Sequence, residues 1–285
     1  MPKDDRQLLR MDGWPGGVNN RVRETEQADS REDGGFPNSA FLRKALNVDL
    51  TAEGHPLRRR GYTLAEAGYA HSVHYAWEAG LYFVVIDGSL KVGPNANELT
   101  MIAQVNKYLH MSYASFAEDV YFMNGVDSGK YGFSGSATWP GPEQDHQIYD
   151  DEGLELVDNV YRTMPIGQLV EGFNGRIYVA KGSEIWFSEG MSTHICRHAT
   201  NYYMLPRYIH MLLASGEGLY VGTENQIVYL RGSNPFEAER DQVYPRGVIP
   251  HAYARVPGEK FGVQEGTVPV FWTTDGVLSV GLPGG

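Results

Sequence analysis

The stretch GRIYVAKGSEIWFSEG, residues 175–190, is the clearest indication of the fold. It holds two runs rich in β-branched and aromatic residues, 176–180 and 184–188, on either side of the turn 181–183. Two such runs joined by a short turn that contains glycine are typical of a β-hairpin. The sequence therefore predicts a hairpin here.

The same pattern recurs along the chain. A strand-like run, a turn with Gly, Asp or Glu, and a second run that opens with an aliphatic residue occur in segments 71–93, 111–133, 167–189, 209–232 and 268–281. Aligning the second runs gives equivalent positions to Tyr82, Tyr121, Tyr178, Tyr220 and Leu278. Repeats of roughly 40 to 50 residues with several strands each are typical of β-propellers. We predict an all-β, β-propeller-like fold with about five blades.

Two charged, turn-rich segments interrupt this pattern, at 141–153 and 233–247. We expect them to be surface loops inserted between strands. Because the repeat is degenerate, a β-sandwich with uneven strands is the alternative fold.

The bulk composition limits the classes of function. The 285 residues carry a formal net charge of -11 at pH 7, whereas proteins that grip nucleic acid cluster Lys and Arg on one surface. The single cysteine, Cys196, cannot form an intramolecular disulfide. No stretch approaches the roughly 20 apolar residues of a membrane-spanning helix, and the first 17 residues lack the apolar core of a secretory signal. We expect synthesis in a cytoplasm and no membrane insertion.

The first 38 residues have mixed charges and no sustained hydrophobic period. We expect an extended N-terminal arm at 1–38, followed by the propeller-like domain at 39–285. A frayed terminus is the alternative. The arm nevertheless contains apolar side chains that favour docking, either on its own body or on a neighbour: Leu8, Leu9, Met11, Trp14 and Val18.

Motifs for metals and phosphates are weak. SGKYG at 128–132 lacks the remaining residues of a phosphate-binding loop, and the calcium-loop-like segment 49–60 has Arg60 where the bidentate Glu is needed. His194, Cys196 and His198 alternate, so a strand would bring them to one face as zinc ligands, but no fourth ligand is obvious. We expect an exposed connection there, with no metal and no cofactor.

Catalytic residues are not evident either. Asp119, Glu184 and Asp275 are acids of the kind that glycosidases use, but each sits at a predicted turn, where acids are common for solvation. Their spacing fixes no carboxylate pair. We expect no enzyme activity.

Residues 41–63, preceded by GGVNN at 16–20, resemble a family of tailed-bacteriophage virion proteins of the β-propeller type. Further similarity lies in 185–206 and in GLYVGT at 218–223. The matching residues of the N-terminal part are Gly17, Asn19, Asn20, Ala45, Asn47, Val48, Asp49, Gly54, Leu57, Arg58, Arg59, Gly61 and Tyr62.

The resemblance implies a structural role in the virion tail, at the nozzle or in a hub-like position. It implies a homo-oligomeric ring around the DNA exit path, with other virion tail proteins as partners and DNA passing without specific binding during ejection. A neighbouring subunit could order the arm. Arg58, Arg59 and Arg60 then become candidates for pairing with an acidic neighbour, the alternative being a solvated charge run at a strand edge.

Two other functions stay open. One is a carbohydrate-binding or glycan-hydrolysing propeller that acts at the host cell surface, which predicts a pocket lined by Trp or Tyr with at least two convergent carboxylates. The other is a head attachment or decoration protein, which predicts presence on capsids that lack tails.

Overall fold

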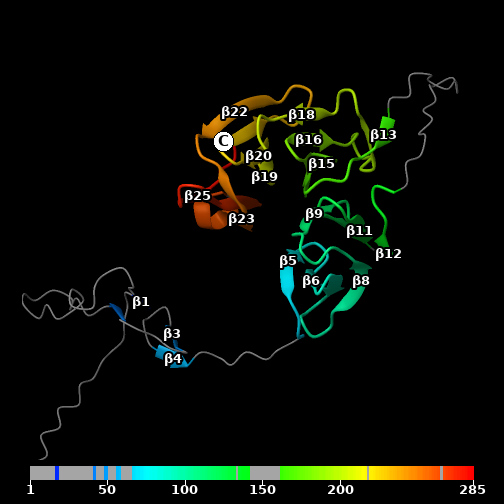
Figure 1. Ribbon diagram of the computed structural model, residues 1–285. Helices are drawn as coiled ribbons and strands as arrows, with labels where there is room; N and C mark the ends of the chain where they lie inside the picture. The colour runs from blue at the N-terminus through cyan, green and yellow to red at the C-terminus, as the bar shows by residue number, and fades with distance from the viewer. Residues whose placement is uncertain are drawn as a thin grey trace, which may run out of the picture. The chain divides into compact units, whose positions relative to one another are not determined.

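A computed structural model describes the residues 66–132, 134–141, 161–216, 218–263 and 266–285 with their side chains, and four short strands of the preceding chain by their backbone alone (Figure 1). The chain divides into two units, Met1–Leu64 and Ala65–Gly285. The predicted boundary between residues 38 and 39 lies among residues outside the described ones and stays a prediction.

In the first unit, β1 (Gly17–Val18) pairs in parallel with β2 (Phe41–Leu42), and β3 (Val48–Leu50) pairs antiparallel with β4 (Pro56–Arg58). Of the predicted interface residues, Val18 and Arg58 lie in β1 and β4. The others lie outside the described residues: Leu8, Leu9, Met11, Trp14, Arg59 and Arg60.

The second unit contains five small antiparallel sheets, the blades of a β-propeller. Blade 1 consists of β5 (Ala70–Ala76), β6 (Leu81–Ile86), β7 (Ser89–Gly93) and β8 (Thr100–Gln104). Blade 2 consists of β9 (Ser112–Phe116), β10 (Asp119–Met123), β11 (Ser128–Gly132) and β12 (Gly135–Ala137). Blade 3 consists of β14 (Leu169–Phe173), β15 (Arg176–Lys181), β16 (Glu184–Phe187) and β18 (Tyr202–Met204).

Blade 4 consists of β19 (Ile209–Ser215), β20 (Gly218–Thr223), β21 (Ile227–Arg231) and β22 (Glu239–Tyr244). Blade 5 has three described strands, β23 (Val248–Pro257), β24 (Thr267–Thr273) and β25 (Leu278–Val280). Two further strands, β13 (Tyr161–Thr163) and β17 (Ile195–Arg197), pair with each other, and a short 3-10 helix, η1 (Gly258–Phe261), follows β23. The described part of the chain holds no helix long and apolar enough to cross a membrane.

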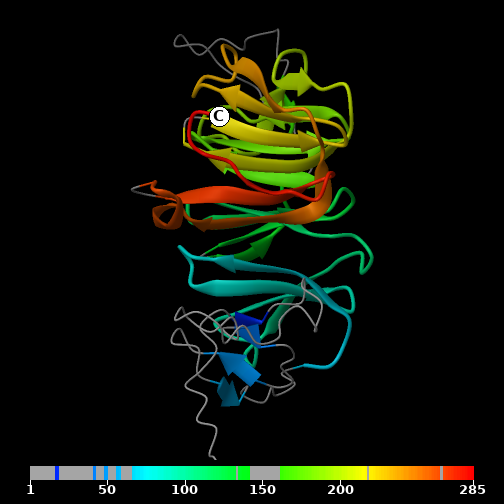
Figure 2. The same ribbon diagram turned by 90° about the vertical axis from the view of Figure 1, so that its left-hand side faces the viewer.

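This architecture confirms the predicted all-β propeller with five blades, and the sandwich alternative is wrong. Figure 1 looks along the axis around which the blades are arranged, and Figure 2 shows them edge-on. The first strand of each blade, β5, β9, β14, β19 or β23, is innermost.

The core lies between successive blades. In β10, Val120 and Phe122 pack toward blade 1, whereas Tyr121 and Met123 pack toward blade 3. Alternate side chains of a strand point to opposite faces, so a strand covered on both sides needs a continuous apolar run. Such runs are what the sequence shows in the second strand of each blade.

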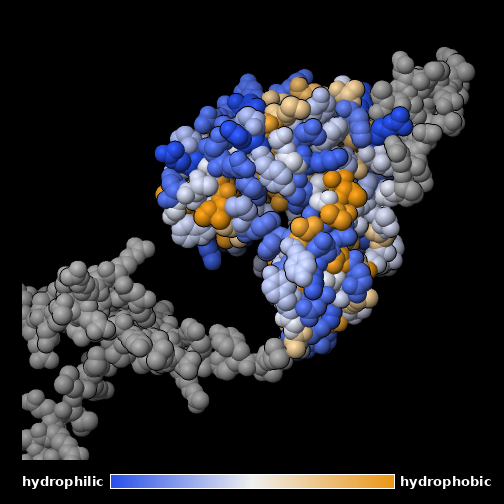
Figure 3. Space-filling view, in the orientation of Figure 1, coloured by the Kyte–Doolittle hydropathy of each residue, from blue (hydrophilic) through white to orange (hydrophobic). Residues whose placement is uncertain are grey.

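Buried clusters of this kind join blades 1 and 2, 2 and 3, 3 and 4, and 4 and 5. Within the described ranges no such cluster joins blade 5 to blade 1. The two end blades therefore each present one face that no other described blade covers, and hydrophobic surface is visible on the blades in Figure 3.

On blade 5, Phe271 packs against blade 4, so its neighbours in β24 point the other way. The register then assigns to the open face of blade 5 the residues Ala254, Val256, Val268, Val270, Trp272, Leu278 and Val280. Val268 among them is fully buried. Trp272 and Leu278 are 45% and 53% exposed. This face is apolar throughout, like the faces that are buried between blades.

On blade 1, Phe83 packs toward blade 2, so Tyr82 and Val84 point away from it. Their cross-strand partners Tyr75 and Lys91 share this open face of blade 1. Glu66 forms an ion pair with Lys91, so the chain that leads into β5 passes over this face.

Two expectations about strand positions are wrong. Leu278 lies in the third strand of blade 5, not the second, because β24 is the second. Segment 233–247 is not only loop: β22 forms the outermost strand of blade 4. That strand is largely exposed and polar, so a search for apolar runs overlooks it. In segment 141–153, residues 142–153 lie outside the described ones.

Candidate functional site

The axis of the propeller holds an ion pair. Arg255 of β23 donates a hydrogen bond to the carboxylate of Glu171 of β14, whose side chain is only 6% exposed. The backbone N–H of Gly172 donates to Glu171 Oε1 at 3.0 Å. Burial raises the pKa of Glu171, and the guanidinium of Arg255 opposes that rise. The pair connects the innermost strands of blades 3 and 5.

Next to this pair, two aromatic rings from blades 1 and 2 are stacked. The rings of His74 and Tyr113 lie 5.0 Å apart at 8°. His74 Nε2 and the Tyr113 hydroxyl are buried and have no hydrogen-bond partner among the described residues. Burial, and then the charge of Arg255, lower the pKa of His74 to about 4, so its imidazole is neutral at pH 7.

A second group of side chains, which we term the histidine layer, occupies the beginnings of innermost strands: His71, His110, His210 and His251. The rings of His110 and His251 are stacked 4.1 Å apart, and the His71 ring lies 5.4 Å from His110. The Ser72 hydroxyl is 2.8 Å from His71 Nδ1 and accepts a hydrogen bond from the N–H of Met111 at 2.9 Å.

Two members of the histidine layer, His71 and His251, have lowered pKa values. Burial, followed by His110 and His210, lowers the pKa of His251 to about 4. Burial and His110 also lower the pKa of His71. Since His251 belongs to blade 5 and His110 precedes blade 2, their stacked rings connect these two blades.

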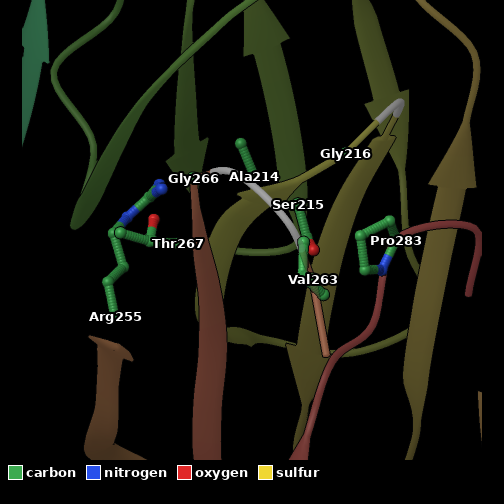
Figure 4. Close-up of a pocket in the computed structure, with 8 residues that line it drawn as sticks. All are labelled: Ala214, Ser215, Gly216, Arg255, Val263, Gly266, Thr267 and Pro283. Carbon is green, nitrogen blue, oxygen red and sulfur yellow. The ribbon is translucent and has the colours of Figure 1, made fainter. Parts of the chain in front are cut away.

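A pocket of about 420 Å³ opens beside the ion pair, lined by Ala214, Ser215, Gly216, Arg255, Val263, Gly266, Thr267 and Pro283. In Figure 4, Arg255 and Thr267 lie on one side of it and Pro283 on the other. The charged residue among those that line it, Arg255, is already paired with Glu171.

The acids singled out in the sequence are not brought together as a pair. Asp119 accepts a hydrogen bond from Lys130 at 2.6 Å, Glu184 accepts one from Trp186 Nε1 at 2.9 Å, and Asp275 accepts one from Tyr244 at 2.9 Å. Asp119 begins the second strand of its blade, whereas Glu184 begins the third, so the two lie at opposite ends of the antiparallel strands.

The alternating His194, Cys196 and His198 do not form a metal site in the structure. Cys196 is buried in β17, where burial and Glu189 raise the pKa of its thiol to about 12. His198 Nε2 lies 3.2 Å from the carbonyl oxygen of Thr163. Across the described residues there is no group of three or more His, Cys, Asp or Glu side chains suited to a metal ion.

Sequence reasoning missed the axial residues because it followed the second strands, which are the most hydrophobic. The histidines of the first strands were a signal that the sequence did contain. Aligning the first strands of the repeats would have placed His71, His110 and His210 near the same point of each, where core residues are not required.

An aromatic cluster lies on blade 1. The Tyr75 ring is 4.6 Å from Trp77 and 4.5 Å from Tyr82, and Trp77 is 77% exposed. Exposed aromatic rings in contact provide a flat apolar surface with polar edges.

Comparisons with known proteins find similarity of fold. No protein-family model matches the chain, and no curated protein sequence matches it. Among solved structures, virginiamycin B lyase from Staphylococcus aureus is similar over 75% of this chain and 69% of its own, with 13% identity and a TM-score of 0.43. Sqt1 from Saccharomyces cerevisiae is similar over 84% and 66%, with 8% identity and a TM-score of 0.45.

The computationally designed protein Ika4 is similar over 61% of this chain and 90% of its own, with 11% identity and a TM-score of 0.36. At these identities the similarity says nothing about activity.

Proposed function

We propose that this protein is a structural component of a bacteriophage tail, of the nozzle or hub-like kind, that assembles as a homo-oligomeric ring around the DNA exit path. The observation that carries the proposal is the open face of blade 5, where seven apolar residues form a sheet face that no described blade covers. Apolar faces of this kind mark surfaces that bind other proteins. The resemblance of residues 16–63 to tailed-phage virion proteins favours copies of this chain and other virion tail proteins as the partners that bind this face.

The charge of the chain agrees with this role. A net charge of -11 repels the phosphate backbone, so DNA passes a ring of such subunits without specific binding. The part of the protein that meets DNA needs no base-reading side chains, because passage requires only that DNA does not adhere.

The axial contacts support the same role. The Arg255–Glu171 pair and the stacked histidines connect blades that are not neighbours in the chain. Such cross-links make the five blades one rigid unit, which is what a building block of a tail needs.

Labelling purified virions tests the proposal. Gold-labelled antibody against this chain is expected to mark the tail tip in electron micrographs of intact particles. Labelling of capsids that lack tails would instead support the head attachment or decoration alternative, and particles without label would contradict both.

A second candidate function is glycan binding, which the exposed contact of Tyr75, Trp77 and Tyr82 favours. Aromatic faces of this kind stack against sugar rings. Binding of the full chain to a glycan array tests it: Trp77→Ala is expected to abolish binding, whereas Tyr108→Ala, which removes a ring that is 78% exposed outside this cluster, is expected to keep it. Absence of binding by the unsubstituted protein would exclude this candidate.

A further inference from the structure

The outer edge of β25 differs from the corresponding edges of the other blades. In blades 1 to 4 the third strand pairs with a fourth, whereas β25 pairs only with β24 among the described strands. A strand edge without a partner leaves backbone N–H and C=O groups that can pair with another strand. Here the edge borders the apolar open face of blade 5, which includes Leu278 and Val280 of β25 itself.

The strands described in the first unit pair with one another. β1 pairs with β2, and β3 pairs with β4. A second copy of the chain, which the proposed ring provides, is a source of a fourth strand for blade 5.

The sequence of the arm contains a segment suited to the site. Leu9 and Met11 alternate with Arg10 and Asp12. In an extended strand such alternation places the two apolar side chains on one face and the two charged ones on the other. A strand added beside β25 in this way would lay Leu9 and Met11 on the open face while its backbone pairs with the free edge.

We propose that the arm of a second copy, residues 1–38, binds blade 5 as a fourth strand beside β25 and covers the open face of that blade. This inference rests on the proposed function and names the contact that joins the subunits of the ring. Because β1 pairs with β2, the part of the arm that can extend toward a second copy is residues 1–16, which span up to about 53 Å. Each copy both gives an arm and receives one, which is a heterologous contact of the kind that builds rings when the rotation between copies closes.

Subunit mixing with the full-length chain tests the contact. The acceptor variant carries Trp272→Glu and Leu278→Glu, which place charge on the open face at exposed positions. The donor variant carries Leu9→Asp and Met11→Asp. A control variant carries Val126→Glu and Tyr108→Glu, at positions that are 63% and 78% exposed on other blades. Circular dichroism and thermal unfolding verify that each variant is folded.

Mass is measured by light scattering after size exclusion, over a range of concentrations. We expect the unsubstituted protein and the control variant to form oligomers, and the acceptor and donor variants to be monomers when alone. Mixing the two monomers is expected to restore a complex, because the intact arm of the acceptor variant fits the intact face of the donor variant. A mixture that stays monomeric would overturn the inference, as would oligomers of either variant alone.

A monomeric unsubstituted protein would also overturn the inference, since the arm would then have no second copy to bind. The proposed function fails separately. If virions carry the protein at the tail and both variants still form its oligomers, the ring stands and this contact is wrong. If mixing restores a complex but virions carry no label, the contact stands and the tail role is wrong.

Discussion

Arg255 in β23 donates a hydrogen bond to the buried carboxylate of Glu171 in β14, and this contact joins the innermost strands of blades 3 and 5 across the axis. Blade 5 also packs on blade 4 through the apolar cluster around Tyr220 and Phe271, and its His251 stacks on His110. The ion pair therefore holds the last blade to a further point of the ring.

Replacing Glu171 with Gln tests this cross-link. The substitution leaves Arg255 without its counter-charge, and breaking a buried pair typically costs 3 to 5 kcal/mol. Because the Arg255 side chain is 36% exposed, we expect a smaller loss of about 2 kcal/mol in the free energy of unfolding, measured by urea denaturation. Asp241→Asn, which breaks the exposed pair with Arg231, is the control and is expected to change stability by less than about 0.5 kcal/mol. Equal effects would contradict the role of the axial pair.

The lowered pKa of His251 in the histidine layer predicts that the protein loses stability in acid. The pKa of His251 is about 4 in the folded protein against 6.5 for a free side chain, so the unfolded chain binds the proton more tightly. The contribution of His251 to the free energy of unfolding is then fully present above about pH 6.5, and it is lost as the pH decreases toward 4. Thermal unfolding between pH 7 and pH 4.5 measures this.

His251→Asn separates the contribution of this residue from that of other groups. Asn tolerates the left-handed backbone at this position, where φ is 60°, and it removes the titrating ring. We expect the variant to lose less of its melting temperature between pH 7 and pH 4.5 than the unsubstituted protein. An unchanged pH dependence would show that His251 does not titrate as its surroundings indicate.

Gly247, just before β23, has no room for a side chain. A Cβ there would lie 2.0 Å from the carbonyl oxygen of Glu224 and 2.2 Å from its carbon, and the backbone cannot move aside without disturbing blade 4. We expect Gly247→Ala to destabilise the protein by about 2 kcal/mol or more, measured by chemical denaturation. Gly190→Ala is the control, because the nearest atom to its Cβ is 3.7 Å away on the Arg176 side chain. Similar losses in both variants would contradict the steric argument.

Ser112 connects blades 2 and 3 by a polar contact. Its hydroxyl accepts a hydrogen bond from the backbone N–H of Val170 at 3.0 Å. Ser112→Ala would leave that N–H without a partner between the blades, at an expected cost of about 1 to 2 kcal/mol in unfolding free energy. Ser136→Ala, at an exposed position of β12, is expected to be neutral. A neutral result for Ser112→Ala would mean that water replaces the hydroxyl.

The sequence predicted the fold through the second strands of the blades. Tyr121 and Tyr178 stand in long apolar runs because both faces of their strands are covered, and such runs are visible without a structure. The strand β22 was missed for the opposite reason: as an outermost strand it is largely exposed, and residues such as Glu239 and Arg240 resemble those of a loop.

The axial site was not predictable by the same means. Glu171 is one acid among 35 in the chain, and nothing near it in the sequence distinguishes it. Its burial results from the packing of three blades around the axis, and its partner Arg255 is 84 residues away. A pairing over such a distance depends on the order of the strands in space, which single-sequence patterns do not contain.

Among the described residues, four apolar interfaces join the five blades in chain order as a linear series, and none joins blade 5 to blade 1. In a linear series the end members have one stabilising neighbour and the middle members have two. Blade 1 should thus fray first, because blade 5 is also held to blade 3 by Arg255 and Glu171, and the amides of blade 1 should exchange hydrogen earlier than those of blade 3. A segment or partner that covers the open faces of both blade 1 and blade 5 would leave no end blade in this series. It would therefore slow hydrogen exchange in two blades that are far apart in the chain.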